Sequence, residues 1–466
     1  MAANAQAKRP PANAALIDEL RAFLGDRLST VRAIRDRHGK DESYHPTVAP
    51  DAVAFAESTE EVAEIVKRCA AHRVPVVPFG TGTALEGGIA ALHGGICIDL
   101  SGMNQVLRVS AEDLDCAVQA GVTRKRLNEH LRDTGLFFPI DPGADASLGG
   151  MAATRASGTN AVRYGTMREN VLGLTAVLAD GRIVRTGTRA RKSSAGYDLT
   201  RLLVGSEGTL GVITELTLRL HGIPEAMSAA VCPFPTVADA VNTVIQTIQL
   251  GVPVARIELL DATQMDACNR YSKLNFAVLP TLFFEFHGTE RGVVEQAELV
   301  GDIAAEFGGS EFQWETRAED RSKLWQARHD AYYAALALRP GSQGMPTDVC
   351  VPISRLAECI EETRADVERA GVLAPLVGHV GDGNFHLVYV LDPENAAEIE
   401  RAEELHERMV LRALAMGGTC TGEHGIGYGK LRFLEAEHGE AVAVMRQIKQ
   451  ALDPLNIMNP GKVIRV

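Results

Sequence analysis

The sequence lacks the features of a membrane-spanning or disulfide-rich protein. No run of eighteen apolar residues occurs in the 466 residues, so we expect no transmembrane helix. The eight cysteines are scattered and form no C-x-x-C pair, which argues against a thiolate zinc or iron–sulfur site. The N-terminus has no apolar signal segment, and it contains too little arginine or serine to suggest a transit peptide. We therefore expect a reducing compartment, the cytoplasm, with peripheral attachment to a membrane left open.

Positive charge is also scarce. The formal net charge of -13 and the pI of about 5.5 argue against nucleic acid as a partner. The composition, 46% hydrophobic and 23% charged, is typical of globular proteins, and the length predicts two or three domains. A chain of this kind needs only one or two local cations to bind an anionic substrate.

Helical periodicity alternates with short β runs through both halves of the chain. The stretch H-G-I-P-E at 221–225 indicates a boundary. We therefore expect an α+β protein with domains at 1–224 and 225–466. The pattern predicts strands at 74–79, 95–100, 281–287 and 386–391, and helices at 14–26, 59–72, 124–135, 236–250, 292–307, 318–338, 354–370, 394–416 and 437–452.

A loop rich in glycine and threonine, P-F-G-T-G-T-A-L-E-G-G at 78–88, follows a predicted strand. Backbone N–H groups in such a loop can converge on a phosphate. The dinucleotide fingerprint does not fit, because Leu85 stands where its third glycine belongs and a strand follows instead of a helix. A loop without a ligand is the alternative. Two more glycine-rich tracts, at 141–165 and 205–214, weigh against that alternative, because long loops in compact domains are usually functional.

The three tracts together resemble the FAD-binding domain of the vanillyl-alcohol oxidase / p-cresol methylhydroxylase superfamily. The motifs are P-x-G-x-G-T-x-L-x-G-G, P-G-A-D-A-S-L-G-G, S-G-T-N-A-V-R-Y-G-T and G-S-E-G-T-L-G-V-I-T. The resemblance implies two α+β subdomains that bind FAD, noncovalently here because the 79–88 loop has no His or Cys. It assigns the phosphates to Gly80, Thr81, Gly82, Thr83 and Gly87, and the rest of the cofactor to Pro142, Gly143, Gly150, Ser157, Gly158, Tyr164, Glu207, Gly208 and Ile213. It also implies that the last segment of the chain returns to the flavin at Asn459.

Two histidines flank a turn in V-G-H-V-G-D-G-N-F-H at 377–386. If Gly-Asp-Gly-Asn is the turn, His379 pairs directly with His386, and their Cβ atoms lie about 5 Å apart on one face. This spacing suits two ligands of one divalent ion, for which Glu423 is a candidate third ligand. The alternative is coincidence, with these residues exposed in a surface hairpin and a loop.

The second half, 225–466, resembles the C-terminal domain of FAD-linked D-2-hydroxyacid dehydrogenases, most closely the D-lactate dehydrogenase (cytochrome) type. The motifs are T-D-V-C-V-P-I-S-R-L, G-H-V-G-D-G-N-F-H, G-T-C-T-G-E-H-G-I-G and L-D-P-L-N-I-M-N-P-G-K-V. Arg328 lies on a predicted helix and could bind a carboxylate, although a solvated surface arginine is the alternative. The resemblance implies a divalent metal, Zn or Mn, on His379, His386 and Glu423, substrate contacts from Arg328 and Asn384, and His424 as the general base.

The resemblance implies oxidation of a D-2-hydroxy acid such as D-lactate, with electrons passed to a cytochrome, a quinone or a flavoprotein. The flavin subunit of glycolate oxidase and D-2-hydroxyglutarate dehydrogenase are the alternatives. The latter branch has a lysine shortly before the aspartate of T-D-V, and the absence of lysine from the tripeptide that precedes Asp348 disfavours a dicarboxylate substrate. An oxygen-using oxidase and a flavin-free sugar- or nucleotide-binding protein are further alternatives, and a homodimer is left open.

Overall fold

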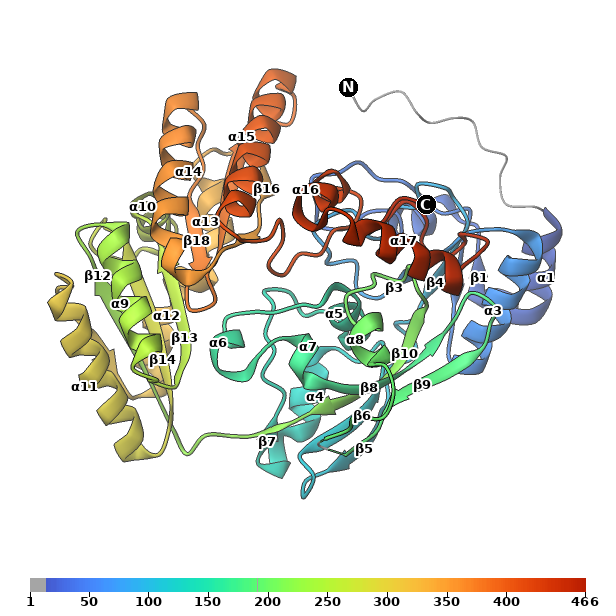
Figure 1. Cartoon of the computed structure of the whole chain (residues 1–466), viewed down its shortest axis with the longest axis horizontal. Helices are drawn as coiled ribbons and strands as arrows, with labels where there is room; N and C mark the ends of the chain where they lie inside the picture. The colour runs from blue at the N-terminus through green and yellow to red at the C-terminus, as the bar shows by residue number, and fades with distance from the viewer. Residues whose placement is uncertain (1–13, 191) are drawn as a thin grey trace. The chain divides into compact units, whose positions relative to one another are not determined.

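The computed structural model describes residues 14–190 and 192–466, which form two compact units (Figure 1). The expectation about a signal or transit peptide concerns the N-terminal stretch, which up to residue 13 lies outside the described residues. One switch between units falls after Gly222, two residues before the expected boundary. Ser157–Gly165 belongs to unit 2 and Glu423–Val466 belongs to unit 1, so the units are not consecutive stretches of the chain. Unit 1 comprises the chain up to Ala156, Thr166–Gly222 and Glu423–Val466, and unit 2 comprises Ser157–Gly165 and Ile223–Gly422.

Unit 1 contains two main sheets and a short strand pair. The four-stranded sheet has the order β1-β2-β4-β3, and β2, β4 and β3 run parallel. The five-stranded sheet, β5-β6-β10-β8-β9, is antiparallel. The strands are β1 (Leu28–Ser29), β2 (Ala52–Phe55), β3 (Val76–Phe79), β4 (Ile96–Asp99), β5 (Val106–Ser110), β6 (Asp115–Gln119), β7 (Leu136–Phe137), β8 (Val171–Val177), β9 (Ile183–Gly187), β10 (Val212–Arg219) and β11 (His221–Gly222).

The helices predicted at 14–26, 59–72 and 124–135 begin at the expected residues, whereas the helix predicted at 437–452 is divided at Gly439. The prediction of 59–72 is confirmed in full: Ser58 caps the first turn by accepting from the Glu61 N–H, and the apolar face of the helix is buried. The unit contains α1 (Ala14–Leu24), α2 (Arg32–Arg37), α3 (Thr59–His72), α4 (Arg124–Leu131), α5 (Leu148–Thr154), α7 (Met167–Asn170), α8 (Leu199–Leu203), α16 (Leu434–His438) and α17 (Ala441–Leu452).

Unit 2 is built on an eight-stranded sheet. Its strand order is β15-β12-β14-β13-β18-β19-β16, with β17 paired to β19 beside that path. The strands β12, β13 and β14 are antiparallel, and β13 continues into the histidine hairpin through β18. The strands are β12 (Ala226–Pro233), β13 (Val254–Leu260), β14 (Thr281–Gly288), β15 (Gln313–Glu315), β16 (Gln343–Pro346), β17 (Val349–Cys350), β18 (Leu376–His379) and β19 (Asn384–Leu391).

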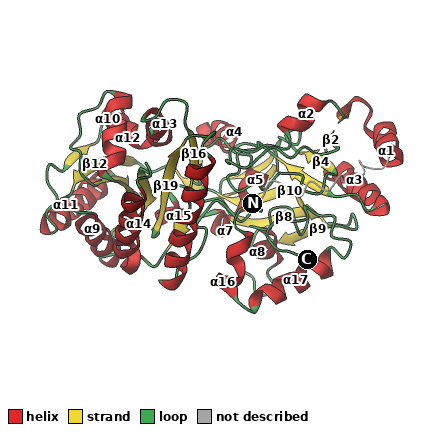
Figure 2. Cartoon of the chain, turned by 90° about the horizontal axis from the view of Figure 1, so that it is seen from above, coloured by secondary structure: helices red, strands yellow, loops and turns green. Residues whose placement is uncertain are grey.

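Helices cover both faces of this sheet. Figure 2 shows α10, α12 and α13 on one side and α9, α11, α14 and α15 on the other. The helix expected at 318–338 is divided at Asp330 into α12 and α13. No helix among the described residues is long and apolar enough to cross a membrane. The helices are α6 (Ala161–Tyr164), α9 (Val237–Gln249), α10 (Ala262–Ser272), α11 (Glu290–Glu306), α12 (Ala318–His329), α13 (Ala331–Ala337), α14 (Leu356–Ala370) and α15 (Ala396–Ala415).

The final segment of the chain is held in unit 1 by buried polar contacts. Lys449 on α17 donates to the carbonyl oxygens of Thr209 and Met458, at 2.8 Å each, and pairs with Asp453. Asp453 also accepts from the Met458 N–H at 2.8 Å. These hydrogen bonds and the ion pair compensate for the desolvation of Lys449 and Asp453. Loss of either side chain would leave the other buried without its opposite charge.

A second anchor of this segment is the buried carboxylate of Glu207. It accepts from the N–H of Ile426 at 2.7 Å and from the N–H of Gly427 at 2.9 Å. Burial raises the pKa of Glu207 to about 7, a shift to which the nearby Glu86 adds and which the two N–H groups oppose. The native state therefore binds a proton here more tightly than an exposed glutamate would.

We predict that Glu207→Gln alters the dependence of stability on pH. The native pKa of about 7 lies above the ordinary value of 4.5. Below pH 4.5 the carboxyl is therefore neutral in both native and unfolded states. As the pH rises from 4.5 to 7, the free energy of unfolding of the wild type should fall by roughly 3 kcal/mol relative to that of the variant, at about 1.4 kcal/mol per pKa unit. The fall occurs because the unfolded state releases the proton in this range and the native state retains it. Unfolding midpoints of the two proteins without FAD, measured from pH 5 to 8, test this.

The matched control for this prediction is Glu129→Gln, on the exposed face of α4. It should show no comparable trend with pH. The substitution of Glu207 also removes one hydrogen-bond acceptor, but that loss gives a constant offset. A difference between the wild type and Glu207→Gln that does not change with pH would contradict the prediction.

Candidate functional site

The two histidines of the hairpin lie diagonally on one face of the sheet. His379 pairs with Asn384, so the predicted direct pairing of His379 with His386 is wrong. The reason is the turn: Gly383 adopts a φ of +79°, the Asp382 N–H donates to the His379 carbonyl, and Asn384 already belongs to β19. Because side chains alternate along a strand, a shift of two residues keeps both histidines on the same face. Their ring centroids are 5.3 Å apart.

Each imidazole is oriented by an acceptor at Nδ1. The Nδ1 atom of His379 lies 2.8 Å from Oε1 of Glu258, and that of His386 lies 2.8 Å from the carbonyl oxygen of Thr347. Since a carbonyl and an ionised carboxylate only accept hydrogen bonds, each Nδ1 carries the hydrogen. The lone pair of each ring is then on Nε2, which is therefore the nitrogen through which each histidine could bind a metal.

Glu423 completes a group of three possible ligands. The candidate ligand atoms of His379, His386 and Glu423 all lie within 4.8 Å of one another. Glu423 is bonded to Gly422, the last residue of unit 2. Two imidazole nitrogens and one carboxylate oxygen suit Zn or Mn and leave coordination positions for a substrate. The donor set therefore fits the metal implied by the sequence.

A buried aspartate holds the loop that leads to Glu423. Asp348 is fully buried and accepts from Oγ1 of Thr421 and from Nδ2 of Asn384, at 2.7 Å each. A Cβ added to Gly422 would collide with the amide of Asn384, so this loop position requires glycine. Asn384 also donates to the carbonyl of Val349 at 2.7 Å, which commits both of its amide hydrogens. The side-chain oxygen Oδ1 of Asn384 is then the atom that could accept a hydrogen bond from a substrate.

Glu258 was not among the predicted site residues, although it joins two of them. One oxygen accepts from Nε of Arg328 at 2.7 Å, and the other contacts His379. Burial disfavours the charge on Glu258, but His379 and Arg328 outweigh burial and hold its pKa below the ordinary value. The sequence V-A-R-I-E-L-L at 254–260 could have indicated this residue, because a carboxylate within an apolar strand is expected to be buried and paired.

A similar group of charges occupies the neighbouring strand β14. Glu285 accepts from Arg256 at 3.2 Å and contacts Nε2 of His287 at 2.7 Å. The other ring nitrogen of His287 lies 2.8 Å from the hydroxyl of Tyr164. Tyr164, predicted as an FAD contact, is thus held within unit 2 together with Ser157 and Gly158.

The loop predicted to bind the FAD phosphates connects β3 to β4 in unit 1. Among the described residues, the backbone N–H groups at 80–83 donate to no protein acceptor. A Cβ on Gly80 would collide with Oγ of Ser147, the N-cap of α5. Open N–H groups beside a position that admits only glycine fit a phosphate cradle. The residues present therefore fit the cofactor.

The other predicted FAD contacts in unit 1 come from several loops. Asn459 donates hydrogen bonds to the carbonyls of Gly88 at 3.0 Å and Glu207 at 2.7 Å. It therefore joins the loop between β3 and β4 to the turn before β10. The side chain of Glu207 is committed to backbone N–H groups of the final segment, as described above. The predicted contacts that lie in unit 1 are Gly80, Thr81, Gly82, Thr83, Gly87, Pro142, Gly143, Gly150, Glu207, Gly208, Ile213 and Asn459.

The predicted base, His424, has a carboxylate nearby in unit 1. Its Nδ1 atom lies 3.7 Å from Oε1 of Glu86, which is within ion-pair distance but beyond a hydrogen bond. Glu86 also pairs with the fully buried Lys430 at 3.1 Å. Neither Glu86 nor Lys430 was among the predicted site residues.

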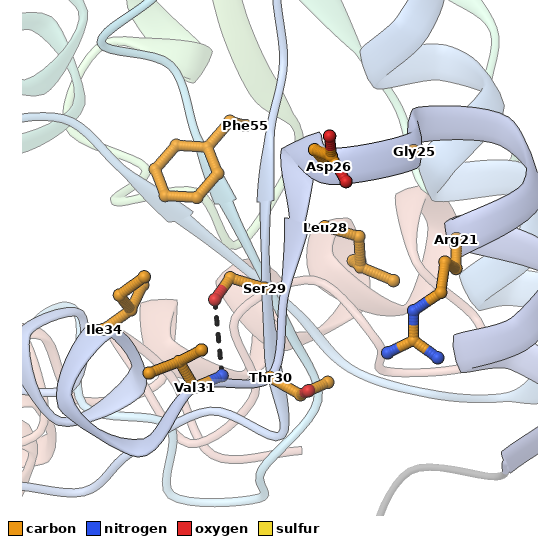
Figure 3. A pocket seen from close by; sticks show the side chains of 9 residues that line it. All are labelled: Arg21, Gly25, Asp26, Leu28, Ser29, Thr30, Val31, Ile34 and Phe55. Atoms are coloured by element: carbon orange, nitrogen blue, oxygen red, sulfur yellow. Dashed lines mark hydrogen bonds between the residues drawn. The ribbon is translucent and has the colours of Figure 1, made fainter.

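Unit 1 also contains a cavity of about 410 Å³ near its first strand (Figure 3). Arg21, Leu28 and Phe55 are among its lining residues. Ser29 Oγ accepts from the Val31 N–H at its wall. None of the predicted site residues lines this cavity, so it is separate from the candidate site.

The sequence matches two family models. Residues 223–463 match the C-terminal domain of FAD linked oxidases, and residues 50–187 match an FAD binding domain. A p-cresol methylhydroxylase structure with substrate bound has the same fold, with a TM-score of 0.80 at 18% identity over 97% of each chain. The predicted α+β class is therefore confirmed, and at this identity the structural likeness concerns the fold alone.

Two relatives share much more of the sequence. A Danio rerio protein named "Probable D-lactate dehydrogenase, mitochondrial" is 56% identical over 97% of this chain and 92% of its own length. An Arabidopsis thaliana protein named "D-lactate dehydrogenase [cytochrome], mitochondrial" is 49% identical over 96% of this chain and 80% of its own length. The chain thus belongs to the FAD-linked oxidases, with an FAD-binding domain followed by the C-terminal domain of that family.

Proposed function

We propose that this chain oxidises a D-2-hydroxy acid, with D-lactate as the preferred substrate, and passes the electrons from FAD to a separate acceptor such as a cytochrome. The observation that carries the proposal is the group formed by His379, His386 and Glu423, whose candidate ligand atoms all lie within 4.8 Å of one another. The relatives named as D-lactate dehydrogenases support the substrate. Those relatives are named as mitochondrial, so the cytoplasm stays a prediction for this chain.

Two cofactors would be held by the residues described. The N–H groups at 80–83 would hold FAD phosphates, and His379, His386 and Glu423 would hold Zn or Mn. When bound, FAD supplies a hydride acceptor at N5, and the divalent ion supplies Lewis acidity toward a hydroxyl.

The substrate would be bound and deprotonated by residues of this chain. Arg328 is fixed through Nε, so its two terminal nitrogens can grip a carboxylate in a bidentate pair. The side-chain oxygen Oδ1 of Asn384 can accept a hydrogen bond from the substrate hydroxyl. His424 would then remove the hydroxyl proton as general base. Loss of the hydroxyl proton to His424, and of the α-hydrogen to the hydride acceptor that FAD would supply, would convert the C–O bond into the carbonyl of the 2-oxo acid. Proton and hydride together account for the two-electron oxidation.

The substrate is tested by anaerobic reduction of the bound flavin. The panel comprises D-lactate, glycolate, D-2-hydroxybutyrate and D-2-hydroxyglutarate, with L-lactate as the control. We expect D-lactate to reduce the flavin fastest and L-lactate not to reduce it. D-2-Hydroxyglutarate should be slow, because the segment before Asp348 contains no lysine for a second carboxylate. A faster reaction with glycolate or D-2-hydroxyglutarate would instead support one of the alternatives.

The proposed base is tested by His424→Ala. General-base catalysis contributes about 10² to 10⁴ in rate, so flavin reduction by D-lactate should slow by that factor while FAD stays bound. Stopped-flow absorbance gives the rate, and the visible spectrum gives the FAD content. The control is His438→Ala, at a partly exposed position on α16, which should reduce at the wild-type rate. If His424→Ala also reduced at that rate, another group would be the base.

The metal is tested by chelation. Dialysis against a chelator should abolish flavin reduction by D-lactate, and added Zn²⁺ or Mn²⁺ should restore it without any change in FAD content. Elemental analysis before and after dialysis identifies the ion. A chelated protein that contains no metal and still reduces its flavin at full rate would refute the metal site.

A further inference from the structure

Two neighbouring strands of unit 2 each place a buried carboxylate between an arginine and a histidine. On β13, Glu258 contacts Arg328 and His379 at 2.7 and 2.8 Å. On β14, Glu285 contacts Arg256 and His287 at 3.2 and 2.7 Å. The glutamate of the first group is completely buried, with an exposed fraction of 0%. Only the first group includes residues of the proposed substrate and metal sites.

We propose that Glu258 is a positioning residue that prepares the metal site and the substrate site with one carboxylate. The proposal rests on the proposed function and deepens it, since it assigns His379 to the metal and Arg328 to the substrate carboxylate. One oxygen fixes the hydrogen of His379 on Nδ1, so that Nε2 carries the lone pair that would bind the ion. The other oxygen holds Nε of Arg328, so that the guanidinium presents its terminal nitrogens as a fork.

A glutamine at position 258 cannot serve both neighbours. An ionised carboxylate offers two acceptor atoms, whereas a carboxamide offers one acceptor and one donor. If the amide oxygen faces Arg328, the amide nitrogen faces Nδ1 of His379 and favours the tautomer with hydrogen on Nε2, in which Nε2 has no lone pair for the ion. If the amide oxygen faces His379, two donors meet at Arg328 and the guanidinium is displaced. Glu258→Gln must therefore damage at least one of the two sites.

The test compares Glu258→Gln with Glu285→Gln, both as purified proteins that contain FAD. Glu285→Gln disrupts the same kind of group without touching His379 or Arg328. Mn²⁺ affinity is measured from the EPR signal of the free ion, and Zn²⁺ affinity by competition with a chromophoric chelator. KM and kcat for D-lactate are measured at saturating metal. FAD content and thermal unfolding show whether each variant is folded.

We expect Glu258→Gln to weaken metal binding by about 10- to 100-fold, as is typical for loss of a group that orients a metal ligand, or to raise KM for D-lactate by at least tenfold. Glu285→Gln should leave both quantities within about twofold of the wild type. The proposal is overturned if Glu258→Gln is folded and both quantities match those of Glu285→Gln. A wild type that binds neither Mn²⁺ nor Zn²⁺ would overturn the proposed metal site and this inference together.

A measurement on the wild type keeps the proposal testable even if Glu258→Gln does not fold. Protein labelled with ¹⁵N at histidine is freed of metal, and two-dimensional NMR reports which ring nitrogen carries the hydrogen. The His379 signal is assigned from its loss in His379→Gln. At a pH at which the ring is neutral, hydrogen on Nδ1 of His379 supports the proposal, and hydrogen on Nε2 overturns it.

Discussion

The candidate site depends on one buried interaction, the contact of the Glu258 carboxylate with His379 and Arg328. A lone buried carboxylate is unstable as an anion, but here the two partners hold its pKa below the ordinary value. The same contacts that stabilise the charge also fix two functional side chains. One set of hydrogen bonds therefore both compensates for the burial of Glu258 and orients His379 and Arg328.

Backbone geometry places the other site residues. Gly383 ends the turn one residue earlier than the sequence suggested, which puts Asn384 in the strand opposite His379. Asn384 and Asp348 then fix the loop that ends at Gly422, where a side chain would collide with the amide. In unit 1, glycine at position 80 likewise permits close packing on Ser147 and leaves nearby N–H groups open for phosphates.

Local patterns predicted much of this from the sequence. The α3 helix was predicted at 59–72 because its cap and its apolar period agree, and the histidines were selected because a turn lies between them. The exact hairpin register was missed, since the motif allows more than one turn. Glu258 was missed because its partners lie 70 and 121 residues away along the chain, and no local pattern reports such contacts. The grouping of Ser157–Gly165 with unit 2 was missed for the same reason.

The most direct test of this account is anomalous diffraction at the zinc edge from crystals of the FAD-containing protein soaked in Zn²⁺. The account predicts a strong peak bonded to Nε2 of His379, Nε2 of His386 and a carboxylate oxygen of Glu423, with both Nδ1 atoms still facing Glu258 and the Thr347 carbonyl. A zinc ion bound through either Nδ1, or no zinc at these residues, would contradict it.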